Sequence, residues 1–138
     1  LRIEHFQVVT PEDIDRALEL GILTAMQFTH ATSDLSMAED RLGPERIQTA
    51  YAWRTVLDKG GIIIGGSDAP VEMVNPFHGL YAGVTRMTRA GEPEGGWYAN
   101  QKVTREEALR AFTIWAAYGH SLRRISRALW SPASWPTL

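Results

Sequence analysis

The sequence predicts an α/β protein built on a parallel sheet. Three short segments rich in β-branched and apolar residues alternate with segments that carry helical signals. The last of the three, residues 62–66, opens with three consecutive isoleucines, a run typical of a parallel strand buried on both faces. Parallel strands need crossover connections, which bring the carboxyl ends of neighbouring strands to one edge of the sheet.

The first strand and helix are expected within the first 21 residues. Residues 1–9 predict a strand with its exit loop. Thr10 followed by Pro11 predicts the start of a helix, because threonine caps helices and proline suits their first position. The apolar stripe of this helix is Ile14, Ala17 and Leu18, and Gly21 ends it.

The second strand is expected over residues 22–28, followed by a polar loop over residues 29–43. Pro44 predicts the start of a second helix, which Gly60 and Gly61 close before the isoleucine strand. We expect the three strands to lie side by side in chain order, all parallel.

Helical signals return after the third strand. Residues 75–89 predict a short helix, and residues 91–100 form a glycine-rich loop. Thr104 and Glu107 have the spacing of a capping box, which predicts the start of a final helix. The apolar residues of that helix are Ala108, Leu109, Phe112 and Trp115.

Composition and net charge argue against several classes of function. The chain has 138 residues, 44% hydrophobic and 22% charged, which fits one globular domain. A net charge of −2 argues against a nucleic-acid partner bound by bulk positive charge, and no apolar run has the ~20 residues of a membrane span. The absence of cysteine means that any metal must bind His, Asp or Glu.

The chain lacks a signal-peptide pattern and begins without Met, so we expect a cytoplasmic protein of which this is an interior portion.

Each predicted strand ends at, or shortly before, a residue that can bind a metal or transfer a proton: His5, His30 and Asp68. Functional groups of parallel α/β folds gather at these carboxyl ends, so the three side chains are expected to converge. A His and an Asp on neighbouring strand ends can share a divalent cation or activate a water molecule.

Each of these residues also has a purely structural interpretation. His5 can be a hydrogen-bonded structural residue, His30 can pack its loop, and Asp68 before Ala69 and Pro70 can initiate a turn. His78 fits a structural or rim role. Glu72 can bind substrate or be a solvated loop charge. Trp97 and Tyr98 can line a pocket or anchor their glycine-rich loop. A nucleotide-binding module is disfavoured, because the sequence has no Gly-x-Gly-x-x-Gly or Walker-type run.

Longer strings around these residues add a family resemblance. Residues 2–5 read RIEH, residues 26–34 read MQFTHATSD and residues 66–72 read GSDAPVE. Further strings are YAWR at 51–54, NP at 75–76, GWY at 96–98 and TREEAL at 104–109. In this order they resemble amidohydrolase family 3, the YtcJ-like group of metal-dependent amidohydrolases, from residue 1 to about residue 118.

The resemblance implies a partial TIM (β/α)8 barrel made of strands six to eight with their helices. It implies that His5 and Asp68 bind a divalent metal, expected to be zinc, and that Asp68 also takes the proton of the attacking water. His30 would contact the substrate or its developing oxyanion. The implied reaction is hydrolysis of an amide-type C–N bond, other than a peptide bond, in a small-molecule substrate.

Two departures from the family pattern lead to an alternative. Phe28 stands where the family commonly has proline, and the His pair and middle-strand ligands of the family are absent from this chain. Two protein ligands are fewer than the three of a catalytic zinc site. The alternative is therefore a non-catalytic α/β fragment that is inactive without the missing N-terminal part of the barrel.

The residues after Tyr118 differ in character from the rest. All acidic residues lie at or before Glu107, and the tail places Trp130 and Trp135 among serines and prolines. Possible codons for residues 128–138 can be regrouped so that the third base of each codon joins the first two bases of the next. In that frame they can encode Ser-Leu-Glu-Pro-Gly-Lys-Leu-Ala-Asp-Leu, which resembles the usual continuation of the family. The junction of Trp135 and Pro136 encodes Ala in that frame whichever proline codon is used. We therefore expect residues 1–118 to be the barrel portion and residues 119–138 a frame-shifted, non-native tail without site residues.

Overall fold

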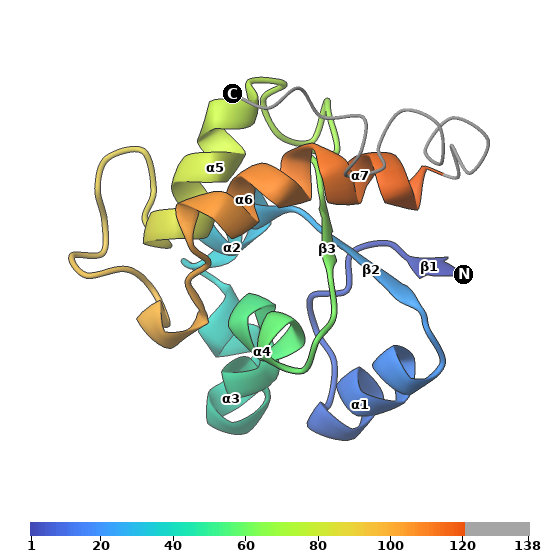
Figure 1. Ribbon diagram of the computed structural model, residues 1–138. Helices are drawn as coiled ribbons and strands as arrows, with labels where there is room; N and C mark the ends of the chain where they lie inside the picture. Colours follow the sequence, from blue (N-terminus) through green and yellow to red (C-terminus); the bar gives the residue numbers. More distant parts are fainter. Residues whose placement is uncertain (121–138) are drawn as a thin grey trace.

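The computed structural model describes residues 1–120 and contains a three-stranded parallel sheet (Figure 1). Its strands are β1 (Arg2–Ile3), β2 (Leu23–Met26) and β3 (Ile63–Gly65), in the order β1-β2-β3. Thr24 lies opposite Ile3 on one side and Ile63 on the other. The predicted parallel pairing and strand order are confirmed.

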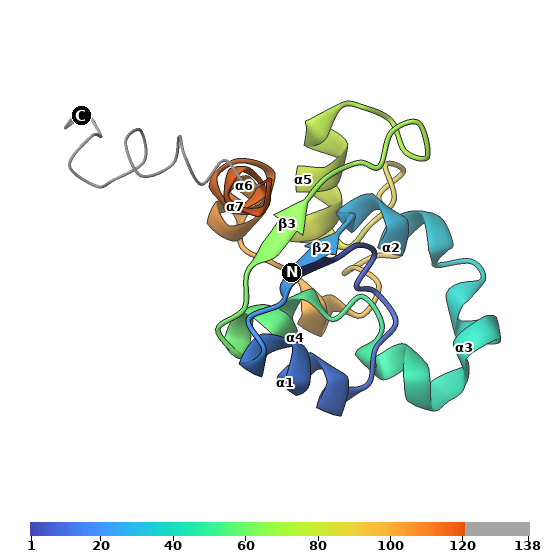
Figure 2. The same cartoon turned by 90° about the vertical axis from the view of Figure 1, so that its right-hand side faces the viewer.

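Seven α-helices accompany the sheet within the described residues. They are α1 (Pro11–Glu19), α2 (Phe28–Asp34), α3 (Ala38–Arg46), α4 (Trp53–Asp58), α5 (Pro76–Thr85), α6 (Arg105–Phe112) and α7 (Ile114–Gly119), with 3-10 turns η1 (Ile47–Thr49) and η2 (Ala99–Gln101). Helices α6 and α7 run almost along one line beside β3, as the end-on view in Figure 2 shows. None of the described helices is long and apolar enough to cross a membrane.

Local sequence signals fix several helix starts. Thr10 accepts a hydrogen bond from the backbone N–H of Asp13 at 3.2 Å, and Asn75 accepts one from Phe77 at 3.0 Å. At α6 both bonds of the capping box between Thr104 and Glu107 are present. The helix starts predicted at these three positions are therefore confirmed.

The expected polar loop over residues 29–43 is wrong, because α2 and most of α3 occupy it. Phe28 begins α2 instead of ending the second strand. Its ring is fully buried and packs on Trp53, with 4.7 Å between the ring centroids. Burial of one face of α2 stabilises a helix whose polar composition alone favours a loop.

The continuous helix expected from Pro44 is also wrong. The chain leaves the helix at Ala50 and Tyr51, where Ala50 forms an antiparallel bridge with Val8. The backbone N–H of Tyr51 donates to the carbonyl of Gln7 at 2.7 Å, so pairing with residues 7–8 replaces helical hydrogen bonds.

Two other elements are shorter than expected. The first strand ends at Ile3 rather than His5, because His5 has a left-handed backbone, with φ 51°, that turns the chain out of the sheet. The final helix is interrupted at Thr113, whose φ of −127° and ψ of −92° separate α6 from α7.

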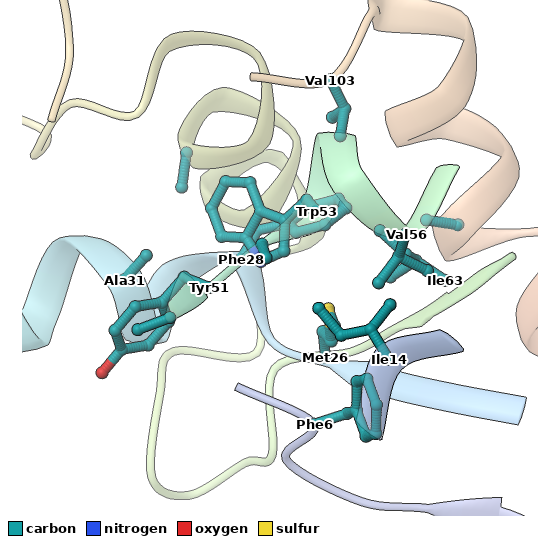
Figure 3. Packing of buried hydrophobic residues seen from close by; sticks show 14 of the residues in the cluster. Phe6, Ile14, Met26, Phe28, Ala31, Tyr51, Trp53, Val56, Ile63 and Val103 are labelled. Atoms are coloured by element: carbon teal, nitrogen blue, oxygen red, sulfur yellow. The ribbon is translucent and has the colours of Figure 1, made fainter. Parts of the chain in front are cut away.

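The hydrophobic core packs against the sheet and includes buried residues of α1, α2, α4, α5 and α6. Met26 and Ile63 project from neighbouring strands toward Ile14 of α1 and Val56 of α4 (Figure 3). This packing fixes where each strand ends and so positions the residues that follow. Of the expected tail over residues 119–138, only Gly119 and His120 are described, and the remainder lies outside the described residues.

Candidate functional site

The structure brings His5, His30 and Asp68 together at the carboxyl ends of the three strands. His5 follows β1, His30 lies in the first turn of α2 directly after β2, and Asp68 follows β3. The Nε2 atom of His5 lies 3.5 Å from Oδ2 of Asp68. The His5 and His30 rings are stacked, with 5.5 Å between centroids and an interplanar angle of 15°.

His5 and Asp68 both have left-handed backbones, with φ 51° and φ 55°. Such conformations are uncommon for residues other than glycine and concentrate at functional sites. Of the five non-glycine residues with positive φ in the described part of the chain, these two lie side by side across the sheet edge. Both side chains are partly exposed, so a ligand can reach them from solvent.

A buried glutamine orients the ring of His5. The Nδ1 atom of His5 lies 2.9 Å from Oε1 of Gln27, whose side chain is 7% exposed. Because a carbonyl oxygen only accepts, Nδ1 donates in this hydrogen bond, and Nε2 is the ring atom that faces Asp68. When Nε2 carries no proton, two hydrogen-bond acceptors face each other at 3.5 Å, an arrangement that a shared cation or proton stabilises.

The separation of these two atoms suits a shared metal ion. Zinc bonds to nitrogen and oxygen are about 2.0–2.2 Å long, so two ligand atoms at a tetrahedral angle lie about 3.4 Å apart. The distance of 3.5 Å between His5 and Asp68 matches this value. The residues present therefore fit a divalent cation between the two side chains.

His30 is held more deeply than His5. It is 8% exposed, and its Nδ1 lies 3.3 Å from Oε1 of Gln7. Its Nε2 is buried and has no hydrogen-bond partner within the described part of the chain. An unpaired buried nitrogen costs free energy unless a ligand satisfies it, so His30 is suited to contact a bound molecule.

Other sequence candidates lie outside this cluster. Glu72 and His78 line a neighbouring pocket, and Glu72 accepts a hydrogen bond of 2.5 Å from Ser33. Trp97 donates from Nε1 to Glu39 at 2.9 Å and contacts Tyr98 edge to face, so the two aromatic residues anchor their own loop.

Sequence reasoning missed the residues that support the site. Gln27 and Gln7 carry no sequence signal for orienting a histidine. Tyr51 donates to Asp34 at 2.6 Å, and burial together with this hydrogen bond raises the pKa of its hydroxyl. Tyr51 lies in the YAWR string and Gln27 in the MQFTHATSD string, and these strings were the available signals.

The described residues contain no group of three or more His, Cys, Asp or Glu side chains arranged to hold a metal ion. His5 and Asp68 form a pair, and His30 stacks on His5 rather than completing a cage. The site as described can therefore contribute to a metal centre but does not enclose one.

Comparisons with known proteins agree on one family. A family model described as "Amidohydrolase family" matches residues 1–125. The chain is 35% identical over 112 residues to YtcJ of Bacillus subtilis (strain 168), which carries an amidohydrolase name, covering 81% of this chain and 21% of that protein. It is 31% identical over 117 residues to the protein LONG AFTER FAR-RED 3 of Arabidopsis thaliana, covering 84% of this chain and 20% of that protein.

Solved structures show the same fold. An uncharacterized metal-dependent hydrolase from Pyrococcus furiosus matches with a TM-score of 0.69 and 29% identity, over 85% of this chain and 23% of that one. One from Pyrococcus horikoshii OT3 matches with a TM-score of 0.73 and 23% identity, over 85% and 24% of the two chains. The chain thus spans about a fifth of the length of the relatives it matches, and it belongs to the amidohydrolase family.

Proposed function

We propose that this chain supplies strands six to eight of a (β/α)8 barrel and part of its metal centre, in a hydrolase that cleaves amide-type C–N bonds of small molecules. The observation that carries the proposal is the His5–Asp68 pair, whose facing acceptor atoms are 3.5 Å apart at the carboxyl ends of parallel strands. Membership of the amidohydrolase family supports the reaction class.

His5 and Asp68 would hold the divalent cation, for which we propose zinc. When bound, such a cation polarises a carbonyl and lowers the pKa of a water molecule. Gln27 would keep the Nε2 lone pair of His5 directed at the cation, as outer hydrogen-bond partners of metal-ligating histidines do.

Asp68 would also act as the proton carrier. Its carboxylate lies at the rim of the sheet and is partly exposed, so it can accept a proton from the attacking water and pass it to the leaving nitrogen. His30 would stabilise the negative oxygen that develops on the substrate. As an imidazolium it donates from Nδ1 to Gln7 and still has an N–H at Nε2, the atom that lacks a partner.

Turnover would require residues beyond this chain. A catalytic zinc ion has at least three protein ligands, and the described residues offer a pair. We propose that the chain by itself binds metal weakly and is inactive until the remaining part of a barrel completes the site. A non-catalytic fragment is thus the second candidate function, and the incomplete ligand set favours it for the isolated chain.

Zinc titration of the purified chain, followed by calorimetry, tests the proposal. We expect one zinc ion per chain, with affinity at least about tenfold lower in His5→Gln and in Asp68→Asn. His30→Ala should leave zinc affinity nearly unchanged, because its assigned contact is the substrate. His78→Gln is the matched control, since it removes a half-buried histidine outside the cluster. Zinc binding that survives both His5→Gln and Asp68→Asn would contradict the proposal.

A further inference from the structure

Helix α2 presents two side chains on one face to the segments around residues 7 and 51. His30 and Asp34 are one helical turn apart on α2, so they project from the same face of the helix. The Nδ1 atom of His30 lies 3.3 Å from Oε1 of Gln7. Asp34 accepts a hydrogen bond of 2.6 Å from the hydroxyl of Tyr51. Two residues from outside the helix therefore hold this face.

Gln7 and Tyr51 are in turn joined to each other through the backbone. The N–H of Tyr51 donates to the carbonyl of Gln7 at 2.7 Å. Tyr51 thus contacts α2 directly at Asp34, and it also contacts the residue that holds His30. The contacts close into a ring, so the loss of any one of them loosens the position of Gln7 relative to α2.

Tyr51 is itself held at each of its polar groups. Its carbonyl accepts a hydrogen bond from Arg86 at 3.0 Å, and its ring lies 5.6 Å from that of Trp97, measured between centroids. The residue is 4% exposed, and its backbone is left-handed, with φ 50°. Such a conformation is uncommon for a bulky residue and persists where the surrounding contacts determine it. In Figure 3 the Tyr51 hydroxyl points away from the other labelled side chains, out of the core cluster.

The contact with Gln7 decides which ring nitrogen of His30 is left for a ligand. A carbonyl oxygen only accepts, so Nδ1 donates to Gln7, and Nε2 is the ring atom without a partner in the described part of the chain. A group that stabilises a developing oxyanion acts best when it is oriented before the substrate binds. The position of Gln7 relative to α2 therefore matters for the role proposed for His30, and Tyr51 contacts both.

We propose that Tyr51 is a positioning residue for His30, which keeps Nδ1 of the ring against Gln7 and so leaves Nε2 for the substrate. It acts through two contacts, from its hydroxyl to Asp34 and from its backbone N–H to Gln7, and takes no part in the chemical steps itself. The proposal rests on the proposed hydrolase function and deepens it, since it names the residue that prepares the oxyanion-stabilising histidine.

The tautomer of His30 measures this positioning in the metal-free chain. Spectra that resolve both ring nitrogens are recorded with ¹⁵N-labelled histidine at pH 8.5, above the ordinary histidine pKa of about 6.5. The signals of the four histidines are assigned by single substitutions. We expect the Nδ1–H form of His30 to predominate. Gln7→Leu should lower the ratio of the Nδ1–H form to the Nε2–H form about fivefold, because it removes the acceptor.

Variants of the Tyr51–Asp34 hydrogen bond test the positioning role. Tyr51→Phe keeps the ring and removes the hydroxyl, so the same ratio should fall at least about twofold. Asp34→Ala should lower it as much, and the double variant should lower it no further. Asp34→Asn keeps an acceptor and should leave the ratio near that of the unmodified chain. Tyr118→Phe is the matched control, since Tyr118 is exposed and lies beside the amino ends of β2 and β3.

An unchanged ratio in Tyr51→Phe and Asp34→Ala, or a predominant Nε2–H form in the unmodified chain, would overturn the proposal. Equal loss in Asp34→Ala and Asp34→Asn would also overturn it. Urea unfolding shows which variants fold, and if Tyr51→Phe does not, the two Asp34 variants decide the outcome. Because the measurement needs neither zinc nor turnover, the proposal can fail while His5 and Asp68 still bind metal.

Discussion

Gln27 and Gln7 each accept a hydrogen bond from Nδ1 of a histidine at the strand ends. Since a neutral imidazole has a single N–H, Nε2 of a neutral His5 is left with a lone pair, whereas His30 needs a second proton to donate from Nε2. The Nε2 atom of His5 faces Asp68, and that of His30 is buried without a partner. At the residue scale, two uncharged side chains therefore determine what the histidines can bind.

Replacing Gln27 tests this control of His5. Gln27→Leu removes the acceptor and frees the ring to rotate, so we expect zinc affinity to fall about tenfold. Gln27→Glu keeps an acceptor at the same place and should retain or raise the affinity. Calorimetric zinc titrations of both variants measure the effect, with denaturant unfolding to show that each remains folded. Equal affinities of the Leu and Glu variants would contradict the assigned role.

Arg86 is a residue-scale feature with a structural role. It is 1% exposed, donates to the backbone carbonyls of Trp97 at 2.6 Å and Tyr51 at 3.0 Å, and lies 4.2 Å from the centre of the Trp53 ring. Burial lowers its pKa to about 10, so the guanidinium is still charged at neutral pH. Cation–π contact and the two carbonyls take the place of a carboxylate partner.

We expect Arg86→Ala to lower the free energy of unfolding by about 3 kcal/mol, because two buried carbonyls and two aromatic faces lose their partner. Arg86→Lys should recover only part of this loss, since an ammonium group lacks the planar fork that reaches both carbonyls. Urea unfolding measures both effects. Arg41→Ala, at an exposed position, is the control and should change stability by less than about 0.5 kcal/mol. A loss below about 1 kcal/mol in Arg86→Ala would show that the buried contacts matter little.

At the scale of elements, α6 is tied to α4 through its capping residue. Glu107 caps the backbone N–H of Thr104 at 2.7 Å and also pairs with Arg54 of α4. Burial raises the pKa of Glu107, but hydrogen bonds from Arg54 and Thr104 and the charge of Arg54 outweigh it. The net result is a pKa below the ordinary value of 4.5.

This shift predicts a pH-dependent stability contribution. Because the folded-state pKa of Glu107 is lowered, its contribution is complete above about pH 4.5 and is lost as the pH falls through the folded-state value. We expect Glu107→Gln to cost about 0.5–1 kcal/mol at pH 7 and almost nothing at pH 3, measured by urea unfolding at both values. Glu106→Gln, which removes an exposed pair with Arg110, is the control and should cost about 0.3 kcal/mol. A Glu107→Gln effect that is the same at both pH values would refute the assigned linkage.

At the scale of the whole molecule, the sheet has an open side. Within residues 1–120, strand β1 pairs only with β2 and lies at an edge of the sheet (Figure 1). Its residue Ile3 is 38% exposed. An apolar groove of about 340 Å³, whose lining includes Ile3, Val8 and Leu20, runs between this edge and α1. Unpaired strand edges with apolar flanks promote association between chains.

We therefore expect the chain to self-associate as its concentration rises. Ile3→Lys should shift the monomer–oligomer equilibrium toward monomer, because a charged side chain on an edge strand opposes pairing. Sedimentation velocity over a range of concentrations measures this shift. Leu109→Lys, at an exposed leucine on α6, is the control and should leave association unchanged. A chain that stays monomeric at several hundred micromolar would contradict the prediction.

The sequence by itself determined the parallel strand order and the position of the site residues at the strand ends. These features depend on signals that act within a few residues, such as the isoleucine run before Asp68 and the capping residues Thr10 and Thr104. Strand ends of a parallel sheet meet at one edge whatever the length of the crossover. The neighbourhood of His5, His30 and Asp68 could therefore be predicted without coordinates.

Only the tertiary structure decided the features that depend on partners distant in sequence. The helix that begins at Phe28 is stabilised by Trp53, and the break at Ala50 is made by pairing with Val8. The ring tautomer of His5 is set by Gln27, 22 residues away along the chain. Arg86 is buried because two tryptophans and two carbonyls meet around it, although an arginine after a helix ordinarily lies in solvent. No local pattern specifies these contacts, since each exists only after the sheet and helices have packed together.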